Sequence, residues 1–147
     1  DELKKNNLGD DPTIISEKEF SNKFKNKLLI GSCTLDSIAE ELDQISLIKI
    51  DTEGAEFFTI KSGMNTFKKT TSFLVGLFNP YTTSRFGYEA CDSANFLIEN
   101  GFNHAYRISG NSELALTPLD MPTEKFETPD YYLFSKKDPE SLGLNLN

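Results

Sequence analysis

Two short apolar runs constrain the fold of this chain more than any other feature. The first, SLIKI, covers residues 46–50, and the second, SFLVGLF, covers residues 72–78. SFLVGLF has no polar alternation, which is typical of a strand buried on both faces in a parallel sheet covered by helices. The apolar residues at helical spacing between the two runs are Phe57, Ile60, Met64 and Phe67. The order strand, helix, strand predicts an α/β sandwich with a mixed, mainly parallel sheet.

Local signals predict the other elements. Ser16 and Glu19 have capping-box spacing, which predicts a short helix over residues 17–25. Thr34 can cap a second helix, which ends near residue 43 and carries on one face Leu35, Ile38, Ala39 and Leu42. A third helix is predicted over residues 89–100, with Gly101 as its stop. The remaining predicted strands cover residues 28–33, 102–108 and 131–137.

The length of 147 residues fits one α/β domain over residues 1–147. Residues 1–12 are polar and contain Gly9 and Pro12, so we expect a mobile leading segment. Residues 138–147 are expected to form a tail. Cys33 and Cys91 belong to no CxxC or Cys/His cluster, which indicates two buried thiols in a reduced, cytoplasmic protein.

The formal net charge is −8, and only two of the basic residues are arginines. Recognition of a phosphate backbone requires a dense lysine and arginine surface, so we expect no nucleic-acid partner. An anionic membrane surface is disfavoured for the same reason. No apolar run approaches the about 20 residues of a membrane span, so we expect no membrane partner.

The acidic turn, residues 51–56 with the sequence DTEGAE, is the first candidate functional site. It follows SLIKI directly, and in open α/β sheets ligands bind beyond the carboxyl ends of the strands. Acidic residues also occur at helix starts for purely electrostatic reasons, and that explanation suits Glu56 best. Asp51 is the hardest to explain in this way, because it follows the buried Ile50 at the strand tip.

A second candidate place follows SFLVGLF. Asn79 and Tyr81 would line the rim of a substrate pocket there, although Asn79-Pro80 is also an ordinary start for a turn. His104 is the single histidine of the chain and would act as a base only if Asp51 lay close to it. The Gly-rich phosphate loops and the GxSxG nucleophile motif are absent from the sequence.

TLDSIAEEL, followed closely by LIKIDTEGAE, resembles the FkbM-type methyltransferase family. The resemblance runs from about Thr34 to Ile108, and YYLFSKK is similar to the last strand of the same fold. It implies a Rossmann-like sandwich that uses S-adenosylmethionine to methylate a hydroxyl of a sugar or secondary-metabolite-like small molecule.

The resemblance also implies roles for the acidic turn. Asp51 and Glu53 would be the catalytic carboxylates, with Asp51 ahead of Glu53 as the base that takes the hydroxyl proton. Asp51, Thr52 and Gly54 would contact the methyl donor, and Asn79 and Tyr81 the acceptor. No residue is assigned as a metal ligand. Family members often carry an acidic residue where this chain has Leu77-Phe78-Asn79-Pro80, which leaves part of the acceptor site undefined.

The glycine-rich turn and the acidic residue that hold the donor in this family are absent from the chain. The resemblance therefore implies the C-terminal half of such a domain, with an incomplete donor site, and leaves open whether the chain is active alone. SLIKI would then be the fourth strand of the fold, with an open ladder edge. Because such an edge is a template for pairing, we expect the rest of a longer chain, a second copy or a partner subunit to cover it.

Two alternatives remain. A noncatalytic binding or assembly module would use the open SLIKI edge to pair with a partner. A divalent-metal enzyme would use Asp51, Glu53 and Asp36 as oxygen ligands, because hard cations favour carboxylates.

Overall fold

The chain divides into two compact units, residues 1–32 and residues 33–147. The computed structural model describes residues 2–6, 12–16, 31–77, 83–109, 115–121 and 124–142. In the first unit, β1 (Glu2–Asn6) and β2 (Pro12–Ser16) form an antiparallel pair with Leu3 opposite Ile15. This pair is not among the elements expected from the sequence, which favours a mobile segment over residues 1–12. The helix predicted over residues 17–25 lies outside the described residues.

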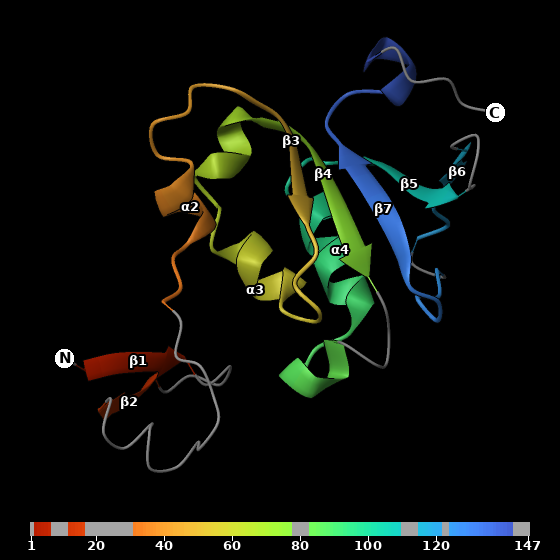
Figure 1. Ribbon diagram of the computed structural model, residues 1–147. Coiled ribbons are helices and arrows are strands. Elements are labelled where there is room, and N and C mark those ends of the chain that lie inside the picture. The colour runs from red at the N-terminus through yellow and green to blue at the C-terminus, as the bar shows by residue number, and fades with distance from the viewer. Residues whose placement is uncertain are drawn as a thin grey trace. The chain divides into compact units, whose positions relative to one another are not determined.

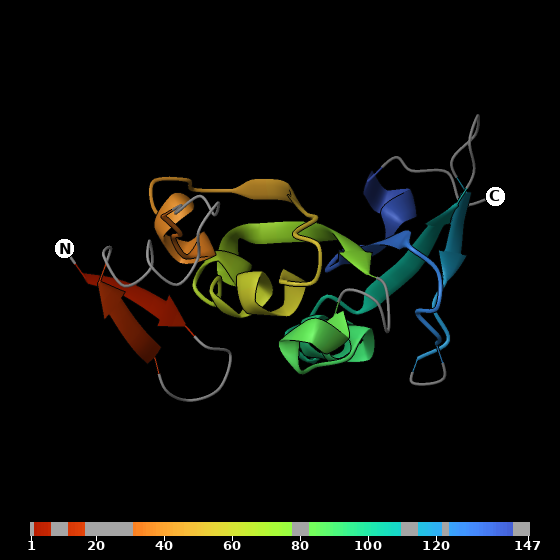
Figure 2. The ribbon, with the colours of Figure 1, turned by 60° about the horizontal axis from the view of Figure 1, so that its bottom comes forward.

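The second unit contains a five-stranded sheet with two α-helices on one face (Figure 1, Figure 2). Its strands are β3 (Ile45–Ile50), β4 (Thr70–Leu77), β5 (His104–Ser109), β6 (Ala115–Pro118) and β7 (Asp130–Ser135). Its α-helices are α2 (Leu35–Ile38), α3 (Glu56–Lys61) and α4 (Ala90–Glu99). Short 3-10 helices are η1 (Thr66–Lys69), η2 (Thr83–Phe86) and η3 (Pro139–Leu142). Figure 2 shows α3 and α4 together on the same side of the sheet.

The strand order is β3-β4-β7-β5-β6. β3 and β4 are parallel, whereas β4 with β7, β7 with β5, and β5 with β6 are antiparallel. The predicted mainly parallel sheet is therefore wrong for the described strands, although an α/β fold with a mixed sheet is confirmed. The reason is that β7 pairs with both β4 and β5 and runs antiparallel to them. β6 adds a further antiparallel pair with β5, and its residues lie in a polar stretch for which the sequence predicts no strand.

β3 lies at one edge of this sheet, and its partner in the described part of the chain is β4. The edge expected for SLIKI is therefore present among the described strands. Leu47, in the middle of β3, has 51% of its surface exposed. An apolar residue on an edge strand is the kind of feature that natural sheets usually cover or charge.

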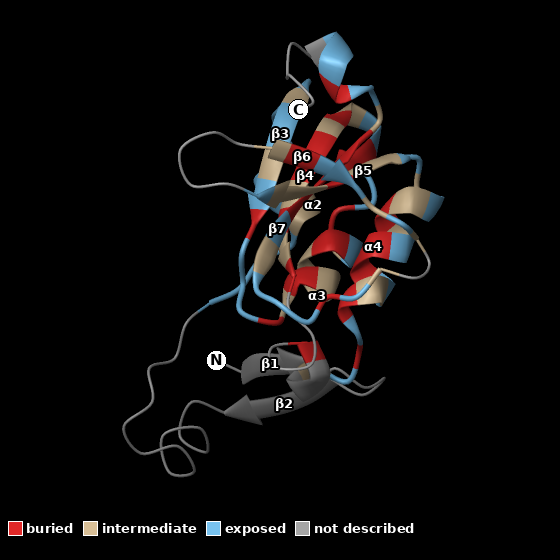
Figure 3. Ribbon diagram, turned by 90° about the vertical axis from the view of Figure 1, so that its right-hand side faces the viewer, coloured by how far each residue is buried: buried red, intermediate tan, exposed pale blue. Residues whose placement is uncertain are grey.

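The main core lies between the sheet and the helices α3 and α4, where Figure 3 shows buried residues concentrated. Tyr132 and Phe134 of β7 belong to this core, whereas Leu133 between them packs with Tyr106 and Leu116 in a smaller cluster. Because successive residues of a strand point to opposite faces, the smaller cluster lies on the face away from α3 and α4. The other buried apolar residues of the main core are Ile50, Ile60, Phe67, Phe73, Val75, Leu77, Ala90, Ala94, Leu97, Phe102 and Phe126.

Helix α4 agrees closely with its prediction. Glu89 is its N-cap and forms a capping box with Asp92. Asn100 is its C-cap, and Gly101 follows with a φ of 93°, the left-handed conformation that glycine adopts without strain. Both ends of this helix are set by local contacts, which is why the sequence reveals them.

Helix α2 is shorter than predicted. Its N-cap is Thr34, as expected, because the Ser37 N–H donates to the Thr34 hydroxyl at 3.1 Å. The helix ends at Ile38, however, and both Ile38, at 66%, and Leu42, at 51%, are exposed. The predicted apolar face therefore packs inward at Leu35 and Ala39 but not at these two residues. The Lys69 ammonium donates to the Ala39 carbonyl, which satisfies the backbone at this early end.

The helix predicted to continue to Phe67 also breaks, since α3 ends at Lys61 and η1 follows after a turn. The Asp36 carboxylate accepts the N–H groups of Asn65 at 3.2 Å and Thr66 at 2.8 Å. These N–H groups are therefore taken by a distant side chain instead of continuing α3. Met64, predicted to share one helix face with Ile60 and Phe67, is exposed, whereas those two residues are buried.

Cys33 is exposed, and Cys91 is only partly buried against the main core. The expectation of two buried thiols is therefore wrong for Cys33 and met only in part by Cys91. Both are free thiols. None of the helices in the described ranges is long and apolar enough to span a bilayer. The cytoplasmic location stays a prediction.

Candidate functional site

The candidate site lies where β3 ends. Ile50 is buried in the core, and Asp51 directly after it has 38% of its side chain exposed. Helix α3 begins five residues later, at Glu56. The acidic turn is thus the connection between a buried strand and a helix, at the carboxyl end of the strand, where ligands of α/β sheets bind.

Glu56 organises the acidic turn from inside. Glu56 is 2% exposed, and its carboxylate accepts the Thr52 N–H at 2.8 Å, the Thr52 hydroxyl at 3.1 Å and the Gly54 N–H at 3.0 Å. A buried carboxylate is stable only when such donors replace its water. Glu56 therefore has a structural role, as the sequence suggested, but as the centre of the turn.

Tyr88, which precedes α4, fastens the turn to the rest of the unit. Its hydroxyl donates to the Gly54 carbonyl at 2.6 Å and accepts the Phe57 N–H at 3.2 Å. Burial raises the pKa of Tyr88 to about 12, with the Phe57 N–H acting in the opposite direction and the Glu56 charge in the same one. The hydroxyl therefore stays protonated and acts as a structural tie.

Asp51 turns away from this network. Its Oδ2 accepts a hydrogen bond from the Tyr131 hydroxyl at 2.5 Å and lies 3.4 Å from the Lys49 ammonium. The Tyr131 hydrogen bond lowers the pKa of Asp51 most; partial burial acts against it and Lys49 reinforces it. Lys49 also lies over the Tyr131 ring, 5.0 Å from its centroid. The site therefore holds an ionised, partly exposed carboxylate.

Gly76 of β4 lies between Asp51 and Tyr131. A Cβ atom at position 76 would lie 3.3 Å from Asp51 Oδ1 and 3.5 Å from Tyr131 Cε1. Tyr131 is the cross-strand neighbour of Gly76 in the ladder. The absent side chain is what lets two residues from strands on either side of β4 meet above it.

The structure separates the residues predicted for the site. Asp51 and Glu53 are both exposed residues of the acidic turn, and Glu53 has a φ of 53°. The N–H groups of Thr52 and Gly54 both donate to Glu56, so they shape the turn. Asn79 and Tyr81 lie outside the described residues. The roles given to all these residues stay predictions.

His104 is not near Asp51. The ladder pairs His104 with Ser135 and Ser135 with Ser72, two residues after the start of β4. Asp51 is beyond the end of β3, level with Gly76 near the other end of β4. The condition under which His104 would serve as a base for the site is therefore not met.

Sequence reasoning missed Tyr131, Gly76 and Tyr88. A glycine inside the apolar run SFLVGLF is itself a signal of close approach by another group, and it could have drawn attention to position 76. Tyr131 and Tyr88 carried no comparable signal, because their partners are 80 and 34 residues away along the chain.

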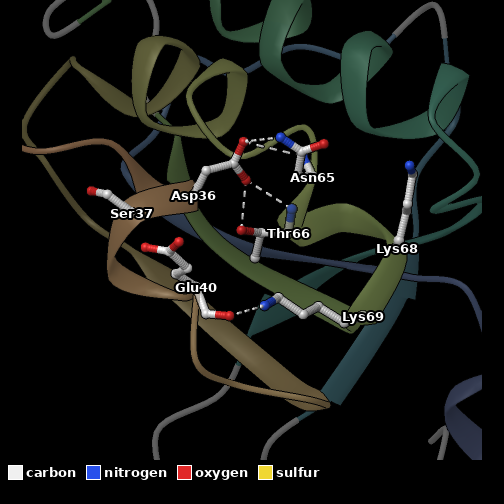
Figure 4. Close-up of a pocket in the computed structure, with 7 residues that line it drawn as sticks. All are labelled: Asp36, Ser37, Glu40, Asn65, Thr66, Lys68 and Lys69. Atoms are coloured by element: carbon white, nitrogen blue, oxygen red, sulfur yellow. Dashed lines mark hydrogen bonds between the residues drawn. The ribbon is translucent and has the colours of Figure 1, made fainter.

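A hollow of about 470 Å³ lies elsewhere, at the amino ends of β3 and β4 (Figure 4). At its centre the Asp36 carboxylate accepts the N–H and side-chain groups of both Asn65 and Thr66. Burial alone would raise the pKa of Asp36, but these four hydrogen bonds outweigh it and lower the pKa. Asp36 is therefore fully used in joining α2 to η1. The other residues that line the hollow are Ser37, Glu40, Lys68 and Lys69.

The described residues contain no set of ligands for the divalent metal ion considered as an alternative. Asp36 lies at the amino ends of the strands and Asp51 at the carboxyl end of β3. Across the described ranges, no three His, Cys, Asp or Glu side chains gather closely enough to hold a metal ion. Asp51, Glu53 and Asp36 do not form the predicted group.

Comparison with known families gives the class of protein. Residues 8–131 match the family described as the methyltransferase FkbM domain. This match covers most of the chain, and the chain therefore belongs to the FkbM methyltransferase family, whose general activity is methyl transfer. The resemblance seen in the sequence is confirmed, and it extends toward the N-terminus beyond Thr34. Searches of curated proteins and of solved structures gave no match.

Proposed function

We propose that this chain takes part in the transfer of a methyl group from S-adenosylmethionine to a hydroxyl of a sugar or secondary-metabolite-like acceptor. One observation carries the proposal: Asp51 presents an ionised, partly exposed carboxylate at the carboxyl end of β3. The parallel unit formed by β3, α3 and β4 supports a Rossmann-like arrangement, because such sheets are built from strand–helix–strand units of this kind.

Asp51 is the described residue best suited to the reaction. A hydroxyl that attacks a methyl group becomes strongly acidic as the new bond forms, so even a carboxylate with a lowered pKa can take its proton. With a pKa below its ordinary value of 3.8, Asp51 is in its charged form near neutral pH. Positioning of the hydroxyl against the methyl group supplies most of the remaining rate.

The described residues fit the methyl donor in part. S-adenosylmethionine supplies an electrophilic methyl group on a cationic sulfonium, and a carboxylate such as Asp51 complements that charge. Thr52 and Gly54 would contribute through the shape of the acidic turn, since their N–H groups are already bound by Glu56. Donor recognition therefore depends mainly on residues outside this turn.

The experiment combines donor binding with transfer. Calorimetry measures S-adenosylmethionine binding to this chain and to any longer product of its reading frame. Transfer of a labelled methyl group to a panel of hydroxylated sugars then compares Asp51→Asn with the unmodified chain. We expect a loss of about 100-fold or more for Asp51→Asn, the usual size for a general base, and a smaller loss for Glu53→Gln.

Asp36→Asn is the matched control, because Asp36 is an aspartate at the other end of the same sheet and touches none of the residues of the site. Its transfer rate should stay within about twofold of the unmodified chain, provided that it folds. Absence of donor binding in both forms of the protein, or full activity in Asp51→Asn, would overturn the proposal.

The edge strand β3 supports a second candidate, assembly through the sheet edge. Leu47 of β3 is half-exposed on this edge, and among the described strands β3 pairs with β4. The simplest partner is a second copy of the chain, which would extend the sheet across the two β3 strands. Light scattering should then show a dimer that Leu47→Lys dissociates, whereas a monomer at high concentration would argue against it.

A further inference from the structure

The pairing of Tyr131 with Asp51 joins two distant parts of the fold. Tyr131 is the second residue of β7, and Asp51 follows the last residue of β3, 80 positions earlier in the chain. The two strands are not neighbours, since β4 lies between them. The contact therefore exists only because both side chains reach across β4 on the same face.

Gly76 makes that reach feasible. It is the residue of β4 level with both Asp51 and Tyr131, and a Cβ there would crowd Asp51 Oδ1 at 3.3 Å. Glycine within a strand weakens the sheet, so its presence marks a place where another group must approach the backbone closely. Here the approaching groups are the carboxylate and the tyrosine ring.

The two oxygens of Asp51 have different surroundings. Oδ2 accepts from the Tyr131 hydroxyl at 2.5 Å and faces the Lys49 ammonium at 3.4 Å. Oδ1 lies over Gly76 and receives no hydrogen bond from any residue in the described ranges. Among the described residues, one oxygen is thus held by the protein, and the other is left to accept a proton.

Tyr131 is the stronger of the two anchors. The Lys49 side chain is 54% exposed, and exposed ion pairs hold a carboxylate weakly because water and salt compete. A hydrogen bond to an ionised oxygen is directional and fixes the plane of the carboxylate. The Lys49 ammonium also lies over the Tyr131 ring, so it contacts the tyrosine as well as the carboxylate.

We propose that Tyr131 is a positioning residue of the methyl-transfer site, which holds Asp51 by its Oδ2 so that Oδ1 faces the acceptor hydroxyl above Gly76. This inference rests on the proposed function, in which Asp51 takes the hydroxyl proton. Tyr131 keeps its own proton throughout: the acceptor proton moves to Asp51 Oδ1, and the Tyr131 O–H continues to donate to Oδ2.

The titration of Asp51 reports this contact directly. The groups that face its carboxylate in the described residues are Lys49 from its own strand and Tyr131 from β7, while β4 contributes only Gly76. The hydrogen bond from Tyr131 lowers the pKa of Asp51, so its removal must raise that pKa. A change of packing elsewhere in the sheet would not produce this shift.

The test uses Tyr131→Phe, which removes one oxygen and keeps the ring. The carbon-13 shift of the Asp51 carboxyl is followed against pH in the whole chain and assigned by its loss in Asp51→Asn. We expect the pKa of Asp51 to rise in Tyr131→Phe and the acid limb of the transfer rate to move to higher pH with it. At neutral pH, kcat should fall by about tenfold, while the KM for the methyl donor changes little.

Tyr106→Phe is the matched control, because it removes a hydroxyl from the same sheet where the ring packs with Leu116 and Leu133, away from Asp51. It should leave the Asp51 titration unchanged. An unchanged Asp51 titration in Tyr131→Phe would overturn the positioning role whatever the activity. A raised pKa together with full activity in Asp51→Asn would instead keep the contact and overturn the proposed function.

Discussion

Asp36 and Asp51 lie at opposite ends of the same two parallel strands, and the fold uses them differently. Asp36 accepts four hydrogen bonds from Asn65 and Thr66, which use up both of its oxygens. Among the described residues, Asp51 is held through Oδ2 alone. Both carboxylates have a lowered pKa, so a lowered pKa does not by itself distinguish a structural aspartate from a functional one. What distinguishes the two aspartates is that Oδ1 of Asp51 accepts no hydrogen bond from the described residues.

Removing each carboxylate in turn tests this difference between Asp36 and Asp51 most directly. Asp36→Ala leaves the N–H and hydroxyl of Thr66, which is 1% exposed, without their acceptor. We expect the free energy of unfolding to fall by about 3 kcal/mol. Asp51→Ala should change it by less than about 0.5 kcal/mol, because Asp51 is partly exposed and its partners can turn to water. Urea unfolding followed by circular dichroism measures both.

Equal losses for the two alanine variants would show that the carboxyl end of β3 also depends on its aspartate for stability. That result would contradict a mainly functional role for Asp51.

Two glycines extend the comparison to packing. At Gly63 a Cβ would lie 2.5 Å from Leu35 Cδ2 and 2.9 Å from Leu35 Cγ, whereas at Gly76 the nearest atom would be at 3.3 Å. Gly63→Ala must push α2 away from the end of α3, which should cost about 2 kcal/mol of unfolding free energy. Gly76→Ala should cost less than about 1 kcal/mol but displace Asp51 by a few tenths of an ångström and lower the transfer rate. Melting temperature and transfer rate together check this pair.

A Gly76→Ala variant with an unchanged rate would show that the position of Oδ1 is not critical. A Gly63→Ala variant as stable as the unmodified chain would show that Leu35 repacks freely.

The smallest expected effect concerns acid pH. The folded pKa of Asp36 lies below its ordinary value of 3.8, so its ionised form contributes stability that is complete above that value. That contribution is lost as the pH falls from 3.8 through the folded pKa. The free energy of unfolding should therefore fall less steeply in Asp36→Asn than in the unmodified chain over this range, as measured by urea unfolding at successive pH values.

Salt sharpens the same measurement. The hydrogen-bond donors that lower the pKa of Asp36 are neutral, so added sodium chloride should leave its share of the acid dependence nearly unchanged. Part of the lowered pKa of Asp51 comes from the Lys49 charge, which salt screens. A salt-sensitive share at Asp36 would contradict the account of its hydrogen bonds.

Much of the local structure could be predicted. The start of α4 near Glu89, its stop at Gly101 and the cap at Thr34 all depend on residues within one turn of each other, and all three are present as predicted. The ends of α2 and α3 could not be predicted, because Asp36 and Lys69 reach across from another part of the chain to take up backbone groups there.

The candidate site divides in the same way. The position of Asp51 after an apolar strand, before a helix, made it a candidate from the sequence. Its partner Tyr131 appeared only as an apolar residue of a predicted strand. Whether a tyrosine at the start of β7 meets an aspartate after β3 depends on the order of strands across the sheet, which no local pattern encodes.

The sequence by itself determined which segments form β3, β4, β5, β7 and α4, and which family the chain resembles, because periodicity, caps and motifs are properties of neighbouring residues. Only the tertiary structure decided that β7 runs antiparallel between β4 and β5. It also decided that both oxygens of Asp36 accept hydrogen bonds while, among the described residues, only Oδ2 of Asp51 does. These outcomes depend on contacts between residues tens of positions apart, whose pairing is set by the packing of the whole sheet.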